Sequence, residues 1–235
     1  MKKIFVVGDL FERFALNSDV MTLTNFIQSH KKNQLIRENS YWVGQGVNQD
    51  DLFNLSQSYP ELFELLQGTS YIEKDKSLVH KQKAENCHLG MVEQLSEQRY
   101  RIPVLIDQHC AELSDHITGE HINGTILMEA VRQACIAVTE KYFIKDQQAV
   151  YFILKEMKCE YTSFLFPLPI TMDYQITQSE IKSAHQTEFE VVAQLYHVSS
   201  QPACKINAKF STYEKNMMSQ LEKGMAQASP ELFID

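Results

Sequence analysis

Apolar and polar residues alternate with a period of two along much of the second half of the chain. Such alternation predicts strands that bury one side and expose the other. Four segments follow it, namely Tyr100–Ile106, Ile170–Thr177, Phe189–Leu195 and Cys204–Phe210. A further segment, Val150–Met157, is almost entirely apolar. Its composition predicts a strand that is buried on both faces.

The spacing of apolar residues changes to three and four in a stretch from about 125 to 143, which predicts a long helix. One side of this helix is apolar and the opposite side is polar. The apolar side holds Leu127, Val131, Ala134 and Val138, and the polar side holds Glu129, Arg132 and Gln133. Two strands, a long helix and four further strands predict an α+β fold in which an antiparallel sheet curls around a central helix.

The first 75 residues differ from this pattern and predict a small mixed α/β domain. The expected elements are a strand at Ile4–Val7, a helix beginning at Ser18, a strand at Leu35–Val43, a helix at Asp50–Ser56 and a helix opening at Pro60. The polar run at residues 73–77 suggests a boundary, so we place the second domain at residues 76–213. Residues 214–235 lack a strand period. Met217, Met218 and Leu221 predict a short surface helix in this tail.

Gly44-Gln45-Gly46 has two interpretations. It resembles part of a glycine-rich nucleotide loop, but the third glycine of such a loop is missing. A lone pair of glycines at this spacing is more typical of an ordinary turn.

Charge, hydropathy and cysteine content limit which partners and which cellular compartment we expect for this protein. The formal net charge of −8 argues against nucleic acid and against anionic membrane surfaces. No window approaches the roughly 18 apolar residues of a membrane span. The apolar run at Ile4–Val7 ends at Gly8-Asp9, too early for a secretion signal. Five scattered cysteines without a C-x-x-C pair are typical of reduced thiols, and we expect a cytoplasmic protein.

Candidate chemistry is concentrated where the long helix begins. Glu129 lies just over one turn into the helix, near the end whose dipole and free N–H groups favour an oxyanion. It is a candidate general base, or a carboxylate that orients the reacting group. His116 or His121 is the candidate second proton-transfer group. Arg132 is suited to hold a phosphate or carboxylate, with Gln133 orienting Glu129 or the acyl carbonyl.

A purely structural interpretation competes with this one. Glu129 and Arg132 have the i, i+3 spacing of a common surface ion pair. His109, His116 and His121 could suggest a metal site, but their spacing matches no common zinc pattern. We therefore expect neither a metal nor a cofactor.

The motif around the helix start also resembles a known family. Asp115-His116, His121-x-x-Gly124 and Leu127-x-Glu129-Ala130-x-Arg132-Gln133 follow one another as in the A-factor biosynthesis (AfsA-type) hotdog domains. Upstream, Leu78-Val79-His80-Lys81 matches the element that opens such a domain. The resemblance covers about residues 77–213. A more distant similarity links Gly124 and Glu129 to the hotdog dehydratases, with Asn123 in place of their proline.

The resemblance implies a hotdog fold and transfer of a β-ketoacyl group to a hydroxyl of a small phosphorylated acceptor such as dihydroxyacetone phosphate. Acyl carrier protein or coenzyme A would deliver the acyl group, toward γ-butyrolactone-type signals. Arg132 would meet the acceptor phosphate and Glu129 would take the hydroxyl proton. Gly124, Asp115 and His80 become candidate substrate-binding residues.

The family typically carries two repeats in one chain, and this sequence shows one. Because hotdog sites form where two units meet, a homodimer is expected. The alternatives are a thioesterase, a β-hydroxyacyl dehydratase that uses His121 with Glu129, or a protein that binds an acyl ligand or a partner without catalysis.

Overall fold

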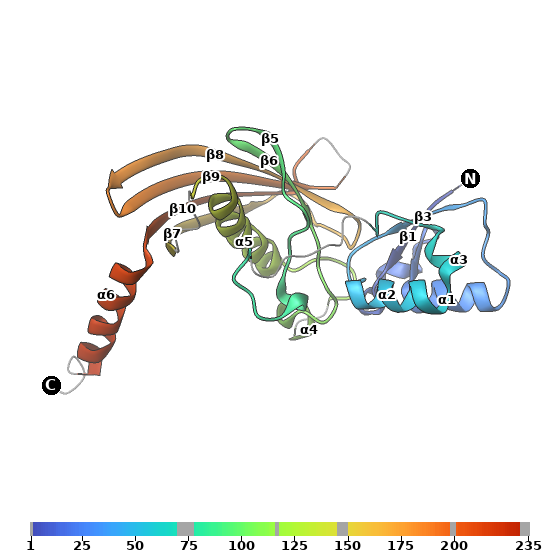
Figure 1. Ribbon diagram of the computed structural model, residues 1–235. Coiled ribbons are helices and arrows are strands. Elements are labelled where there is room, and N and C mark those ends of the chain that lie inside the picture. The colour runs from blue at the N-terminus through green and yellow to red at the C-terminus, as the bar shows by residue number, and fades with distance from the viewer. Residues whose placement is uncertain (1, 70–77, 116–117, 145–149, 198–200, 231–235) are drawn as a thin grey trace.

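The computed structural model describes residues 2–69, 78–115, 118–144, 150–197 and 201–230. Two sheets organise these residues, a small one formed near the N-terminus and a larger one formed after residue 92 (Figure 1). The expected boundary at residues 73–77 lies outside the described residues.

The N-terminal sheet has the order β2-β1-β3-β4, and its pairs are parallel. Its strands are β1 (Lys3–Val7), β2 (Val20–Thr22), β3 (Ser40–Val43) and β4 (Leu66–Gln67). Its helices are α1 (Leu23–Lys31), α2 (Gln49–Ser58) and α3 (Pro60–Phe63), with short 3-10 turns η1 (Asp9–Phe11) and η2 (Phe14–Leu16). The mixed α/β character predicted for this part is confirmed.

Two predicted boundaries in this part are wrong. The helix expected from Ser18 begins at Leu23, because Thr22 ends β2 and its side chain accepts a hydrogen bond from Asn25 N. The strand expected over Leu35–Val43 is confined to β3. The helix predicted at Asp50–Ser56 is confirmed as α2, which Asn48 caps through a capping box with Asp51.

The larger sheet is antiparallel throughout and has the order β5-β6-β8-β9-β10-β7. Its strands are β5 (Glu93–Ser96), β6 (Arg99–Val104), β7 (Val150–Tyr161), β8 (Ile170–Ser183), β9 (Gln186–Tyr196) and β10 (Cys204–Glu214). The long helix α5 (Gly124–Tyr142) lies in the concave face of the curved sheet (Figure 1). The turn η4 (Ala84–Asn86) and the short helix α4 (Ala111–Asp115) precede it. The hotdog arrangement predicted from the sequence is confirmed.

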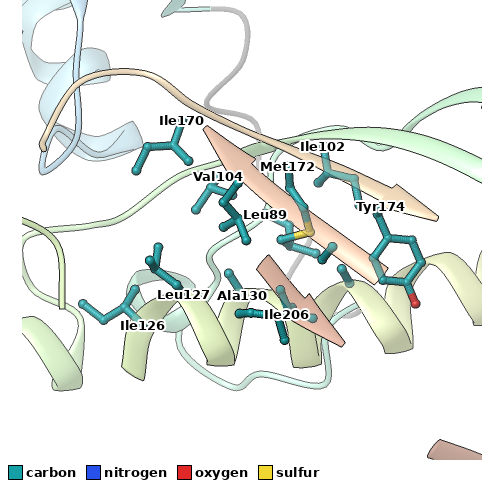
Figure 2. Packing of buried hydrophobic residues seen from close by; sticks show 14 of the residues in the cluster. Leu89, Ile102, Val104, Ile126, Leu127, Ala130, Ile170, Met172, Tyr174 and Ile206 are labelled. Carbon is teal, nitrogen blue, oxygen red and sulfur yellow. The ribbon is translucent and has the colours of Figure 1, made fainter. Parts of the chain in front are cut away.

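The apolar side of α5 packs on the inner face of the sheet. Figure 2 shows Leu127 and Ala130 facing Val104, Met172 and other strand residues. The predicted alternation on β8 is confirmed, since Ile170, Met172, Tyr174 and Ile176 are all buried. Burying each large apolar side chain contributes about 1.5–3 kcal/mol, so this interface is the main stabilising contact of α5.

The strand β7 contradicts its prediction. It is an edge strand, paired with β10 on one side. Its side chains are half-buried or exposed, with Leu154 at 46% and Tyr161 at 51% of their surface open. The apolar run is therefore not buried on both faces within one chain.

Gly44-Gln45-Gly46 joins the two sheets. Gln45 is 3% exposed, and its side chain donates to Val104 O (2.9 Å) and accepts from Ile106 N (2.8 Å). The backbone N–H of Gly46 donates to Ile106 O at 2.7 Å. A Cβ on Gly8 would lie 2.6 Å from the carbonyl of Gly46, which requires glycine at this close approach. The turn interpretation is confirmed, and the N–H groups of Gln45 and Gly46 donate to Pro167 O and Ile106 O, next to strands of the larger sheet.

The chain continues into α6 (Lys215–Ala228), which has no buried residue and projects away from the sheet (Figure 1). This helix extends the short surface helix predicted for the tail. Among the helices that the structure describes, none combines the length and apolarity needed to cross a membrane.

Candidate functional site

A cavity of about 390 Å³ lies beside the first turn of α5. The helix begins at Gly124, after the N-cap residue Asn123. Instead of capping the helix, the Asn123 side chain donates to Glu112 O. First-turn N–H groups have no acceptor within their own helix, so this end can hold a negatively charged oxygen. The cavity is lined by His121, Ile122, Gly124, Leu127, Tyr161, Thr162, Ser163, Phe164 and Leu165.

Gly124 and Tyr161 fit closely at this cavity. The Tyr161 hydroxyl donates to Gly124 O at 2.9 Å. A Cβ on Gly124 would lie 2.5 Å from the Tyr161 hydroxyl oxygen, so any larger residue would displace the ring. Burial, reinforced by the thiol of Cys159, raises the pKa of Tyr161, and its hydroxyl stays protonated as a donor.

His121 forms an aromatic wall of the cavity. Its ring lies 4.8 Å from that of Phe164, measured between centroids. Its backbone is fixed by Thr118, whose hydroxyl donates to His121 O (2.8 Å) and accepts from His121 N (3.1 Å). The imidazole therefore has a defined place beside the helix end.

Glu129 is the centre of a second polar cluster, on the face of α5 covered by residues 78–88. Arg132 holds it bidentately, with Nε at 2.7 Å from Oε2 and Nη2 at 2.8 Å from Oε1. Lys81 Nζ lies 2.8 Å from Oε1, and Gln133 Nε2 donates to the same oxygen at 3.0 Å. The i, i+3 pair noted in the sequence is thus part of a network rather than an isolated surface contact.

This network keeps the Glu129 carboxylate ionised. Burial alone would raise the pKa of the carboxyl group. Hydrogen bonds from Arg132, Lys81 and Gln133 outweigh burial and lower that pKa to about 2. The same ion pair raises the pKa of Arg132.

Gln133 connects the network to the segment before the sheet. It is fully buried, its Nε2 also donates to Asn86 O at 2.8 Å, and its Oε1 accepts from His88 N at 2.8 Å. An amide is suited to this place because it both donates and accepts. Gln133 therefore orients Glu129 and fixes residues 86–88 against α5.

The structure separates the residues predicted for the site into groups. His121 and Gly124 meet at the cavity, whereas Glu129, Arg132 and Gln133 form the second cluster. His80 lies further along α5, where its Nε2 is 2.8 Å from Glu140 Oε1, and Asp115 is exposed at the end of α4. His116 lies outside the described residues.

The sequence interpretation missed two functional candidates. Lys81 belongs to the Leu78–Lys81 motif, and a positive charge in that motif, with a glutamate on the helix, was the available signal. Tyr161 gave no local signal, because the path of β7 brings it to a helix start 37 residues earlier in the chain.

One group among the described residues has the donors and spacing that could hold a metal ion. The candidate ligand atoms of His88, Cys110 and Glu112 lie within 4.8 Å of one another. A zinc ion with bonds of about 2.0–2.3 Å would require these atoms to move closer together. His109 lies elsewhere, lining a smaller cavity with Asn48 and Asp107.

Comparison with known proteins identifies one family. The model of the A-factor biosynthesis hotdog domain (AfsA) matches residues 70–213. No curated protein matches the chain.

Several solved structures are similar. A mutant thioesterase from Pseudomonas aeruginosa is 9% identical, with 72% of this chain and 96% of that chain covered and a TM-score of 0.39. A thioesterase family protein from Silicibacter pomeroyi is 10% identical, with 59% of this chain and 94% of that chain covered and a TM-score of 0.42. A hypothetical thioesterase with coenzyme A from Streptococcus pneumoniae is 9% identical, with 53% of this chain and 85% of that chain covered and a TM-score of 0.37.

Proposed function

Because the chain belongs to the A-factor biosynthesis hotdog domain family, we propose that it is an enzyme that acts on acyl thioesters. Its proposed reaction transfers a β-ketoacyl group to a hydroxyl of a small phosphorylated acceptor, such as dihydroxyacetone phosphate. The observation that carries this proposal is the open cavity at the start of α5.

The cavity suits a thioester carbonyl. Attack on that carbonyl places negative charge on its oxygen, and first-turn N–H groups beside Gly124 can stabilise this charge. The aromatic rings of Tyr161 and Phe164 offer an apolar wall for the acyl chain. In this proposal acyl carrier protein or coenzyme A delivers the acyl group.

His121 is the proposed proton-transfer group. An imidazole can accept a proton from the acceptor hydroxyl and later donate it to the leaving thiolate. His121 lines the same cavity as Gly124, which supports this role. His116 belongs to the same motif and is kept as a candidate for the same role.

Glu129 is proposed as an orienting carboxylate rather than the general base. With a pKa of about 2 it attracts a proton weakly near neutral pH. It instead fixes Arg132, whose side chain is 36% exposed. Two guanidinium N–H groups bind Glu129, which leaves donors at Nη1 for an anionic group such as a phosphate, although Arg132 is not among the residues that line the cavity.

We propose that the active form is a homodimer paired along β7. This strand presents an open backbone edge with exposed apolar side chains, which is typical of a surface that pairs with another strand. Pairing would give the backbone N–H and C=O groups of this open edge hydrogen-bond partners. Since Tyr161 ends β7, each cavity would lie next to the interface.

The test is to incubate the protein with a β-ketoacyl thioester, with and without dihydroxyacetone phosphate, and to follow products by mass spectrometry. We expect a phosphorylated β-ketoacyl ester that forms when the acceptor is present. Substitution His121→Ala should lower turnover about 100-fold, whereas His185→Ala, in an exposed hairpin, should leave it unchanged.

Other outcomes would change the assignment. Free acid forming with or without acceptor would replace the acyltransferase by a thioesterase. A dehydrated product from a β-hydroxyacyl thioester would indicate a dehydratase. Retained acyl-ligand affinity without turnover, unaffected by Glu129→Gln, would indicate a binding protein.

A further inference from the structure

The helix α6 carries an apolar stripe that nothing in the described chain covers. Met217, Leu221 and Met225 recur every four residues and therefore share one face of the helix. They are 39%, 53% and 66% exposed. A helix with one exposed apolar face is typical of an element that packs against another molecule.

The position of α6 points to the side on which that molecule lies. The helix leaves the sheet at Glu214, which pairs with Val150 at the start of β7. The Tyr151 hydroxyl donates to Glu222 Oε2 at 2.9 Å and ties α6 to the same strand. In Figure 1, α6 extends beyond the start of β7 and points away from the N-terminal sheet.

Two-fold symmetry determines what α6 would meet there. In the proposed homodimer, two identical β7 strands related by a two-fold axis across the sheet run antiparallel. The start of each strand then lies near the end of the other. The α6 of one copy leaves the sheet beside Val150 and is therefore brought toward Tyr161 of the second copy.

That end of the second copy exposes apolar surface. Tyr161, Phe164 and Phe166 are 51%, 64% and 37% exposed, and the first two line the cavity. Methionine side chains are flexible and make favourable contacts with aromatic rings. The stripe of α6 and this aromatic rim are thus complementary in chemistry and adjacent in the dimer.

We propose that α6 docks on the second copy of this chain, with its Met217, Leu221 and Met225 stripe over the rim formed by Tyr161, Phe164 and Phe166. Each cavity is then closed in part by the other subunit's C-terminal helix, which becomes one wall of the acyl-chain site. This inference rests on the β7 dimer of the proposed function.

A disulfide-trapping experiment tests the contact. A tagged Leu221→Cys variant and an untagged Phe164→Cys variant of the full chain are mixed, allowed to exchange subunits and oxidised. We expect a tagged–untagged covalent dimer on a non-reducing gel. The control replaces Phe164→Cys with Phe53→Cys, which is equally exposed but lies on α2, and should give little product.

A second measurement addresses the energetic role of the stripe. Leu221→Lys with Met225→Lys should weaken the dimer by about tenfold or more in light scattering across a dilution series. The matched control, Ser219→Lys with Ala226→Lys, adds the same charge to the opposite face and should leave the dimer intact.

The outcomes separate this inference from the dimer itself. A monomeric wild-type chain would overturn both. The wild type could instead be a dimer whose Leu221→Cys and Phe164→Cys variants form no disulfide-linked product. If the two double-lysine variants also dimerise equally well, the docking of α6 is overturned and the β7 dimer is retained.

Discussion

At the scale of single residues, Glu129 shows how neighbours decide what a carboxylate can do. An exposed glutamate on a helix would be an ordinary acid with an ordinary ion pair. Here three donors converge on one partly buried carboxylate and stabilise its charge more than burial destabilises it. The result is a fixed anion that holds Arg132 in place, which is a positioning role.

The depressed pKa of Glu129 predicts acid sensitivity. The pKa is about 2 in the folded chain and 4.5 as its ordinary value, so the unfolded chain binds the proton more tightly. The stabilisation, on the order of 3 kcal/mol, is fully present above about pH 5 and is lost as pH falls from 4.5 toward 2.

Urea unfolding at a series of pH values measures this effect. Glu129→Gln should be less stable at neutral pH and should lose less stability than the wild type on acidification. Parallel acid profiles for the two proteins would contradict the assignment.

Gly124 gives a second prediction at this scale. Gly124→Ala places a methyl group 2.5 Å from the Tyr161 hydroxyl, so the ring must move and its hydrogen bond must lengthen. We expect a loss of about 1–3 kcal/mol in the free energy of unfolding, and loss of most activity.

The control for this substitution is Gly224→Ala in α6. A Cβ on Gly224 meets no atom within 4 Å, so alanine should stabilise the helix by up to about 1 kcal/mol. Thermal unfolding of both variants should therefore give shifts of opposite sign. An unchanged unfolding temperature for Gly124→Ala would show that Tyr161 moves aside without cost and would contradict this prediction.

At the scale of elements, β7 is an apolar strand left at the edge of its sheet. Its apolar run suits burial on both faces, yet its side chains are half-buried or exposed and only one of its edges is paired. The open edge begins with the apolar run at residues 150–154, and an open apolar edge favours pairing with a second strand.

A charge on this edge should therefore disrupt the dimer. Leu154→Lys places an ammonium group on the exposed edge, and we expect light scattering to report the mass of a single chain at concentrations where the wild type is dimeric. Ile181→Lys, on an exposed part of β8, is the matched control. Equal dimerisation of both variants would place the interface elsewhere.

At the scale of the whole molecule, a glutamine and two glycines couple the parallel sheet to the antiparallel one. Gln45 bridges the two through Val104 O and Ile106 N, while Gly8 and Gly46 let the backbones approach. The carboxyl ends of β1 and β3 are thus packed on the larger sheet.

Removal of this bridge should destabilise the whole chain. Gln45→Leu would leave Val104 O and Ile106 N without their side-chain partner in a buried place, at a cost of about 2–4 kcal/mol. The exposed Gln34→Leu should change stability by less than about 0.5 kcal/mol. Differential scanning calorimetry of Gln45→Leu should show an unfolding transition at lower temperature, or two separate transitions for the two sheets. An unfolding transition identical to that of the wild type would contradict the bridging role.

The local pattern of apolar and polar residues was sufficient to predict most strands of the larger sheet and its central helix. The period-two segments predicted β6, β8, β9 and β10, and the three-to-four spacing predicted α5, because strands and helices expose side chains with those periods. The motif also directed attention to His121, Gly124 and Glu129. The start of α1 was misjudged because Val20 fits the spacing of the helix but pairs with β1.

The sequence by itself determined the hotdog architecture, the family and the residue types at the start of α5, since these depend on local periodicity and short-range motifs. Tertiary structure decided which of those residues meet. It placed Lys81 on Glu129, Tyr161 on Gly124 and Gln45 against Ile106, and it left β7 at an edge. These contacts join segments far apart in the chain, and their geometry depends on how the sheet curves and which strands become neighbours.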